Sequence, residues 1–296
     1  MKIFDCTTFY NEKMMMDVRF NVLDQYVSKF IVVESTFSHS GKKKELNFNI
    51  DDYPKFKDKI IHLFIEEEPK NIEKITDNKN SSITKRMNSL KRIEQSYNYM
   101  NNGITQADDN DLIVLSDNDE IPNFDSKYFK EVKNNIFIFK QLFFYYKFNL
   151  FYDRIPWFGS KACKKKNLKS FSWLRNLKNK KYPIWRIDSY FSNLKQRNVR
   201  IVEDGGWHFT NLKTPEEIFI KLSNYGHHNE FEDAGMTLED IKKNINNRIV
   251  DYDHTLDKSQ TNKINNGYKL KIINDTILPK YLVKNKELYK KWFEKD

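Results

Sequence analysis

Cysteine, glycine and long apolar runs are all scarce in this sequence. Cys6 and Cys163 are the only cysteines among 296 residues, and they stand far apart without the spacing of metal ligands. A disulfide framework is therefore not expected, and a reducing compartment suits the chain. Only 8 glycines are present, and no Walker pattern, Gly-rich dinucleotide loop, paired zinc motif or nucleophile elbow occurs. A phosphate ligand would therefore be held by a metal and basic side chains rather than by backbone amides.

Segments that cross a membrane or direct secretion are not expected either. The most apolar run, residues 136–146, contains Lys140 and Gln141 and is far shorter than a bilayer requires. The apolar start of the chain is interrupted at Asn11, before it reaches the length of a signal sequence. No linker rich in Gly, Pro or Ser and no internal repeat divides the chain. We therefore expect a cytoplasmic protein with no integral membrane segment, folded as one domain over residues 1–296.

The charge balance favours anionic partners without selecting one. The chain has 51 Lys and Arg against 41 Asp and Glu, a formal charge of +10, which attracts nucleic acid, phosphorylated small molecules and acidic glycans alike. Much of the basicity is Lys interspersed with Asn, so bulk charge carries little information about function. A hydrophobic content of 39% with 15% aromatic residues indicates a folded protein.

Apolar runs that alternate with helical patterns predict an α/β fold. Strands are expected at residues 3–9, 30–33, 59–65 and 112–115, and helices at 14–26, 84–100, 215–222 and 238–249. The β-branched run 30–33 and the run 112–115 are typical of buried parallel strands. This order predicts an open sheet whose ligand lies beyond the carboxyl ends of the strands. Within the single domain we expect two halves, residues 1–122 and 123–235, and a helical C-terminal extension (236–296).

Acidic and polar residues follow three of these predicted strands. Asn11 and Glu12 follow the first, Glu34 ends the second, and the cluster Asp117-Asn118-Asp119-Glu120 follows residues 112–115. Two carboxylates separated by one residue can hold Mg²⁺ or Mn²⁺, which prefer oxygen ligands and keep open positions for phosphates. Asp119 would reach the metal, and Asp117 would reach the ribose or the metal through water. The alternative is a solvated acidic turn that caps a helix near Phe124.

Several ordered blocks of the sequence resemble the glycosyltransferase family of the β-1,4-mannosyl-glycoprotein β-1,4-N-acetylglucosaminyltransferase. The blocks are Asp17-Val18-Arg19-Phe20, residues 30–35 with Gly41, residues 115–122 ending in Glu120-Ile121-Pro122, Gly206-Trp207-His208-Phe209, Lys221-Leu222, Asn229-Glu230-Phe231 and residues 278–282. Two family segments depart from the pattern: residues 42–45 lack prolines, and residues 88–92 keep only Arg92. The resemblance covers most of the chain.

The resemblance implies a fold, a donor and a mechanism. The fold would be of GT-A type, a Rossmann-like mixed sheet flanked by helices. The donor would be a UDP-sugar, usually UDP-N-acetylglucosamine, the cofactor Mn²⁺ or Mg²⁺, and the anomeric carbon would be inverted. The acceptor would be a carbohydrate or glycolipid. Residues 1–122 would then form the nucleotide-sugar-binding half of the domain, and residues 123–235 the acceptor-side half. Asn118 and Trp207 lie in two of the blocks and are counted among the donor-binding residues.

Individual residues carry open alternatives. Arg19 and Arg92 could bind the diphosphate or Glu34, because guanidinium binds oxyanions bidentately, or could form internal salt bridges. Glu34 could contact the nucleoside or cap a helix. Residues 205–209 are predicted to form a Gly-rich turn. Gly205 and Gly206 would permit close approach of the backbone to a ligand. The family match favours a contact of His208 with the metal or diphosphate, and a structural role is the alternative.

An inverting transfer also needs a carboxylate that deprotonates the acceptor hydroxyl. Glu230 is the first candidate, and Asp204, Asp188 and Glu120 are alternatives. Trp157 and its neighbours could stack on a sugar or pack in the core.

Two functions of other classes remain open at this point. A nucleic-acid-binding protein would use Lys and interleaved aromatic residues, but the acidic cluster would repel a phosphodiester backbone. A metal-dependent nucleotidyltransferase or nuclease would also use paired carboxylates. We therefore expect a UDP-sugar and a carbohydrate as partners rather than nucleic acid, and the sequence does not indicate an oligomeric state.

Overall fold

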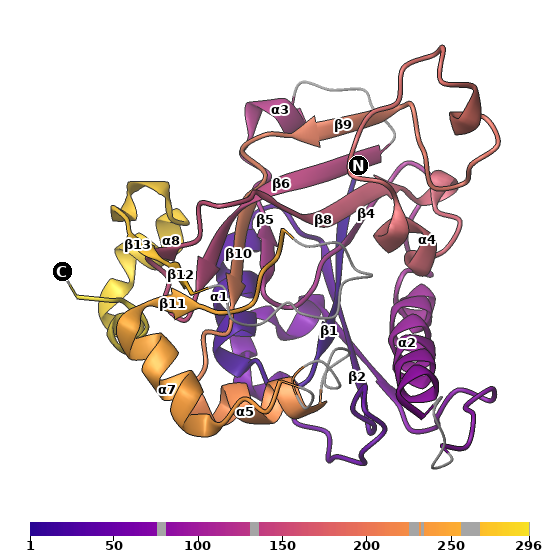
Figure 1. Cartoon of the computed structure of the whole chain (residues 1–296). Helices are drawn as coiled ribbons and strands as arrows, with labels where there is room; N and C mark the ends of the chain where they lie inside the picture. The colour runs from indigo at the N-terminus through magenta and orange to yellow at the C-terminus, as the bar shows by residue number, and fades with distance from the viewer. Residues whose placement is uncertain (76–80, 131–135, 225–230, 232–233, 256–266, 296) are drawn as a thin grey trace.

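An 11-stranded mixed sheet forms the centre of the protein (Figure 1). The structure, a computed structural model, describes residues 1–75, 81–130, 136–224, 231, 234–255 and 267–295. Four parallel strands form one half of the sheet in the order β4-β1-β2-β3: β1 (Ile3–Phe9), β2 (Lys29–Ser35), β3 (Ile60–Ile65) and β4 (Leu112–Leu115). The four predicted strands and their parallel sheet are confirmed.

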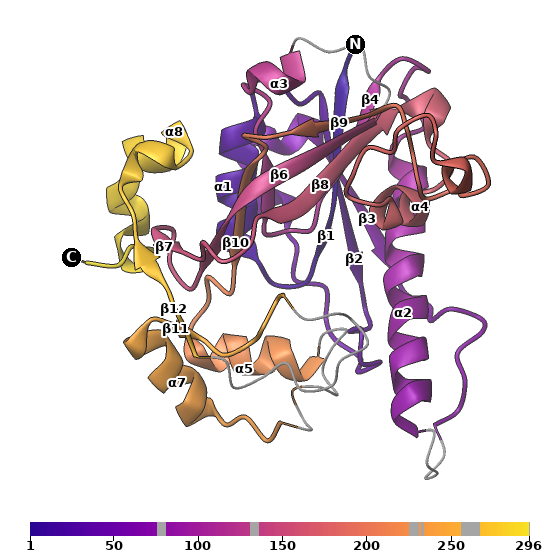
Figure 2. The same ribbon diagram turned by 45° about the horizontal axis from the view of Figure 1, so that its top comes forward.

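Helices cover both faces of this parallel half (Figure 2). Helix α1 (Lys13–Leu23) lies on one face and α2 (Ser81–Tyr99) on the other. Along β2, Phe30 and Val32 join the core cluster on the α1 face, whereas Ile31 and Val33 join the cluster on the α2 face. Side chains alternate between faces along a strand, so a strand covered on both sides must be apolar at every position.

The aromatic-rich second half of the chain extends the sheet. Strand β8 (Trp157–Lys164) pairs antiparallel with β4, and β6 (Ile136–Tyr145) pairs antiparallel with β8. The sheet continues through β7 (Leu150–Phe151) to β13 (Lys271–Ile272), while β9 (Val199–Val202) and β10 (Gly206–Thr210) pair parallel with β6. Short β5 (Glu120–Pro122) pairs antiparallel with β10.

The segment predicted as a Gly-rich turn at residues 205–209 is instead strand β10. Gly206 has φ +115°, and a Cβ there would overlap the carbonyl oxygen of Ile121 on the neighbouring strand β5. The glycine therefore lets two backbones approach rather than reversing the chain. Because β10 is extended, Trp207 and His208 face opposite sides of the sheet.

Helices and short strands complete the chain after β10. They are α5 (Pro215–Asn224), α7 (Leu238–Asn247), β11 (Ile249–Val250), β12 (Tyr268–Lys269), α8 (Lys280–Lys284) and a 3-10 helix at Lys286–Trp292, with α3 (Lys127–Lys130) and α4 (Phe171–Asn176) earlier in the chain. A capping box between Thr237 and Asp240 begins α7. No helix in the part of the chain that the structure describes is long and apolar enough to cross a bilayer.

Candidate active site

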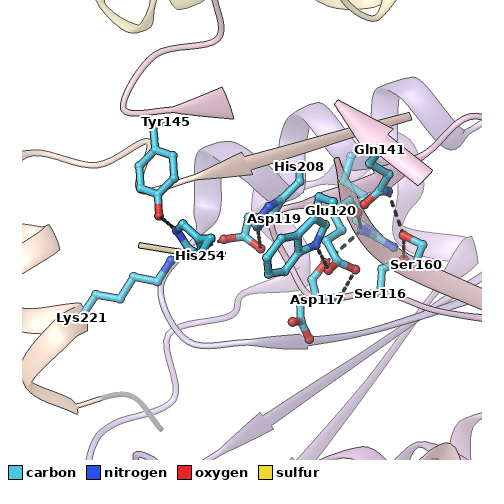
Figure 3. Close-up of polar contacts among 12 residues, drawn as sticks. Ser116, Asp117, Asp119, Glu120, Gln141, Tyr145, Ser160, His208, Lys221 and His254 are labelled. Carbon is cyan, nitrogen blue, oxygen red and sulfur yellow. Dashed lines mark hydrogen bonds and ion pairs between the residues drawn. The ribbon is translucent and has the colours of Figure 1, made fainter. Parts of the chain in front are cut away.

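The acidic cluster lies where β4 ends and β5 begins, beside the carboxyl ends of the parallel strands. Figure 3 shows His208, from β10, and Lys221, from α5, beside Asp119. Trp157, from β8, donates a hydrogen bond to Glu120, the next residue of the cluster. The cluster is therefore part of a built site and not a solvated turn.

Asp119 is the buried centre of the cluster. Its side chain contacts two nitrogen-bearing side chains: Oδ1 lies 3.4 Å from His208 Nε2, and Oδ2 lies 3.4 Å from Lys221 Nζ. Burial alone would raise the pKa of Asp119, but the neighbouring Lys221 and His208 outweigh it and hold the pKa well below its usual range. Asp119 is therefore a carboxylate at physiological pH.

His208 is positioned by the pairing of two strands and by two aromatic rings. It stands opposite Glu120 in the β10–β5 register. Its ring lies between Phe143 and Trp157, with centroid distances of 4.7 and 4.3 Å and nearly parallel planes. This packing directs Nε2 toward Asp119, while the buried Nδ1 has no hydrogen-bond partner among the described residues. The Nε2 atom of His208 is thus held rigidly beside the Asp119 carboxylate.

Glu120 is buried beneath Trp157. The Trp157 Nε1–H donates to Oε1 at 2.8 Å, and the backbone N–H of Asp117 donates to Oε2 at 3.0 Å. Burial, together with the negative charge of Asp117, raises the pKa of Glu120 to about 7. Glu120 can therefore bind and release a proton near neutral pH.

Asp117 points away from the pair formed by Asp119 and His208 (Figure 3). Its carboxylate accepts a hydrogen bond from the Tyr97 hydroxyl and pairs with Arg175 at 3.3 Å. The Arg175 guanidinium lies over the Tyr97 ring, 4.8 Å from its centroid. Both oxygens of Asp117 are therefore engaged by the α2–α4 side of the site.

His39 lies in the loop after β2, and its backbone carbonyl oxygen accepts a hydrogen bond from Arg92 at 3.3 Å. Burial, together with the positive charge of Arg175, lowers the pKa of the His39 imidazole to about 4. The imidazole is therefore neutral at physiological pH.

Asn11 and Glu12 are held together at the end of β1. Glu12 Oε2 accepts the backbone N–H groups of Tyr10 and Asn11, each at 3.0 Å. The buried Lys213 lies 3.4 Å from Glu12 Oε1 and donates to the side-chain oxygen of Asn11. The structure thus adds a lysine to this part of the ligand edge.

Arg19 supports the acidic cluster from inside the protein. The prediction allowed a ligand contact or an internal ion pair, and the structure shows the ion pair: Nε and Nη2 donate to the two oxygens of Asp5 at 2.7 and 2.5 Å. Nη1 donates to the carbonyl oxygen of Glu120. Because the Arg19 side chain is 0% exposed, it positions the cluster and does not touch a diphosphate.

Glu34 and Arg92 also have internal partners. Glu34 is fully buried, pairs with Lys44 at 2.5 Å and accepts the backbone N–H groups of Asn47 and Phe48, so it fixes the loop after β2 instead of capping a helix. Arg92 pairs with Glu68 at 2.5 Å and donates to the carbonyl oxygen of His39 at 3.3 Å.

Three further predicted residues lie away from the cluster. Trp207 faces the opposite side of the sheet, where its Nε1–H donates to the carbonyl oxygen of Ile277 at 2.6 Å. Asp204 is exposed near the start of β10 and accepts a hydrogen bond from Ser126. Asp188 forms exposed pairs on the loop before β9. Glu230 lies outside the described residues, and Asn118 is half-buried in the turn.

Several site residues have no local sequence signal. Tyr97 looks like an ordinary helical core position, His39 and Lys213 lie in loops, and Arg175 lies on a six-residue helix. Lys221 stood out only as part of a family block. The pairing of Asp117 with Arg175 spans 58 positions, and that of Asp119 with Lys221 spans 102. Only the folded chain brings these charges together.

The fold and the site define a class of protein. A mixed sheet flanked by helices, with carboxylates gathered at the carboxyl ends of its parallel strands, is the arrangement of a Rossmann-like enzyme that binds its ligand at that edge. Comparison with protein families finds that the model of Glycosyltransferase family 17 matches residues 1–293, so the chain belongs to this family. The predicted GT-A type fold class and family are thereby confirmed. Comparison with curated proteins finds no match.

Proposed function

We propose that this glycosyltransferase moves N-acetylglucosamine from UDP-N-acetylglucosamine to a hydroxyl group of a glycan or glycolipid, with inversion and with Mn²⁺ or Mg²⁺. Family membership supports the transfer of a sugar. The observation that supports binding of a divalent cation and a diphosphate is the contact of Asp119 with His208 and Lys221 at the carboxyl ends of the parallel strands. The nucleotide, the sugar and inversion rest on the family resemblance.

Asp119 and His208 fit a divalent ion. Asp119 Oδ1 and His208 Nε2 lie 3.4 Å apart, a separation that two ligands of one ion can have. Mg²⁺ is commonly bound by one or two protein ligands and keeps positions for water and substrate phosphates. This suits a chain whose described residues contain no group of three or more His, Cys, Asp or Glu able to hold a metal. When bound, the ion would neutralise negative charge on the leaving diphosphate.

The charge balance of the site supports metal dependence. Asp119 faces Lys221, Asp117 faces Arg175, and Glu12 faces Lys213. Each carboxylate thus already has a cationic partner. A diphosphate that enters such a site adds negative charge, which favours binding together with a divalent cation.

The catalytic base stays a prediction, with Glu230 as its first candidate. Among the described carboxyls, Glu120 has a pKa suited to proton transfer, about 7. Its two oxygens, however, already accept hydrogen bonds from Trp157 and from the backbone of Asp117, and the residue is only 4% exposed. Glu120 therefore fits the positioning of Trp157 and Asp117 better than contact with an acceptor.

The test is metal-dependent release of UDP from a panel of UDP-sugars by the metal-stripped protein. We expect UDP-N-acetylglucosamine with Mn²⁺ to give the highest rate. Asp119→Asn should lower this rate by about 100-fold or more, because it removes a charged ligand. Asp109→Asn, at an exposed aspartate, is the matched control and should keep the rate.

Binding gives an independent readout of the same site. Mn²⁺ and UDP together should raise the melting temperature more than either alone, because each stabilises the folded state through the other. Asp119→Asn should lose this joint effect. Full activity of Asp119→Asn, or equal rates with and without metal, would contradict the proposal.

A further inference from the structure

A loop next to the active site exposes an unusual number of large apolar side chains. The basic-apolar loop, residues 178–198, connects α4 to β9 and projects from the α4 side of the molecule (Figure 1). Ile184, Trp185, Ile187, Tyr190 and Phe191 are 74, 81, 72, 53 and 88% exposed. Large exposed apolar groups gathered in eight residues mark an interaction surface rather than ordinary solvent-facing positions.

The inner side of this loop is fixed to the protein. The Trp173 Nε1–H donates to the carbonyl oxygen of Asn193 at 2.8 Å, and the backbone N–H of Lys178 donates to the carbonyl oxygen of Leu194 at 3.0 Å. Tyr182 is buried. The exposed apolar residues therefore lie on a loop that is anchored at both ends.

The same loop is strongly basic. It contains six Lys and Arg residues and a single acidic residue, Asp188. Asp188 pairs with both Arg186, at 2.8 Å, and Lys195, at 2.5 Å. The loop therefore carries a net positive charge along with its exposed apolar side chains, and the Arg197 guanidinium lies 3.8 Å from the centroid of the Tyr190 ring.

We propose that the basic-apolar loop docks the protein onto an anionic lipid surface. Trp and Tyr side chains favour the boundary between headgroups and acyl chains, aliphatic side chains insert just below it, and Lys and Arg bind anionic headgroups. Ile184 and Ile187 have no ring to stack on bases, so the surface fits lipid better than nucleic acid. A symmetric contact between two copies would bring the two basic loops together, which their charge opposes.

Docking through this loop would bring the active site close to the lipid surface. Arg175, which pairs with Asp117, lies three residues before the loop and lines a pocket of about 520 Å³ together with Lys178, Asn179 and Leu194. The loop and the acidic cluster are therefore neighbours through α4. The docking itself does not depend on which sugar the enzyme transfers.

Cosedimentation of the full chain with lipid vesicles tests this proposal. We expect binding to phosphatidylcholine vesicles that contain phosphatidylserine, weaker binding to pure phosphatidylcholine, and loss of binding in high salt. The double variant Trp185→Ser/Phe191→Ser should weaken binding by about tenfold or more. Leu288→Ser, which changes an apolar residue that is 74% exposed elsewhere, is the matched control and should bind as the wild type does.

Tryptophan fluorescence and melting temperatures complete the test of membrane docking by this loop. A blue shift of tryptophan fluorescence on vesicle addition, absent in Trp185→Ser, supports insertion. Unchanged melting temperatures show that the variants fold. The proposal is overturned if the wild type ignores anionic vesicles at low salt or if the double variant binds them normally. It is equally overturned if the loop variants abolish binding of single-stranded RNA or self-association while vesicle binding is unaffected.

Discussion

Glu120→Gln should change how the stability of the protein depends on pH. In the folded protein Glu120 lies beneath Trp157, and burial together with the charge of Asp117 raises its pKa to about 7, from an ordinary value of 4.5. Between pH 4.5 and about pH 7, Glu120 keeps its proton in the folded state and has released it in the unfolded state. The free energy of unfolding therefore falls as pH rises through this window.

The size of the effect follows from the displacement of the pKa. One pKa unit corresponds to 1.36 kcal/mol. Raising the pKa of Glu120 from 4.5 to about 7 therefore removes about 3 kcal/mol of stability as pH rises through this window. Glutamine has no proton to lose, so this contribution disappears in the variant. One hydrogen bond, from Trp157 or from the backbone of Asp117, is also weakened, but that cost is the same at every pH.

Urea unfolding of the metal-free protein from pH 4.5 to pH 8 measures this difference. The wild type minus Glu120→Gln difference in unfolding free energy should decline by about 3 kcal/mol across the range. Glu203→Gln, at an exposed carboxyl paired with Lys140, should leave the pH profile of the wild type intact. Asp117→Asn should move the Glu120 transition to lower pH, because it removes a neighbouring negative charge.

Parallel pH profiles for the wild type and Glu120→Gln would refute this reasoning. They would mean that Glu120 is ionised throughout, with an ordinary pKa, and that the site around Trp157 is more hydrated than the structure shows.

The remaining predictions concern the packing beneath the site. Arg19→Met should lower the free energy of unfolding by about 3 to 5 kcal/mol, since it leaves the buried Asp5 without its partner; a loss below 1 kcal/mol in urea unfolding would argue against the buried pair. Gly159→Ala should cost about 1 to 3 kcal/mol, because its Cβ would overlap Gln141 and approach Glu120 Cδ to 2.7 Å. An unchanged melting temperature would contradict this close approach.

The parallel half of the fold was predictable because the apolar runs in its sequence match the burial of its strands on both faces. Residues 30–33 and 112–115 are apolar at every position, and a strand covered by helices on both faces requires that. The acidic cluster was found by the same logic, because it follows one of these strands directly.

The strand at Gly206–Thr210 was not predictable in the same way. Two adjacent glycines usually indicate a turn, but here the close approach of β5 requires a residue without a side chain. Once the segment is extended, alternation places His208 in the site and Trp207 behind it, where it binds the carbonyl oxygen of Ile277. Neighbours in sequence thus have separate roles because a partner strand, distant in sequence, fixes the backbone.

The role of Arg19 was ambiguous for a related reason. Arg175 was not a predicted site residue, although it has the same chemistry, and nothing local distinguishes the two. The pairing of β1 with β4 places Asp5 beside Val114, so that Arg19 closes an internal pair beneath the cluster. The contact of α2 with α4 places Arg175 at the rim, beside Asp117. Which arginine can meet a ligand therefore depends on long-range packing.

The distribution of charge links the two proposals. The chain carries a formal charge of +10, but the site itself pairs each of Asp119, Asp117 and Glu12 with a cation. Much of the excess lies instead in the basic-apolar loop, which has six basic residues and one acidic residue. A nucleic-acid groove would need that charge to line the ligand edge of the sheet, whereas here it lies in the same loop as exposed Trp185 and Phe191. The basicity of the chain therefore fits attachment to an anionic surface, and the neutral site fits a donor that arrives with its own divalent cation.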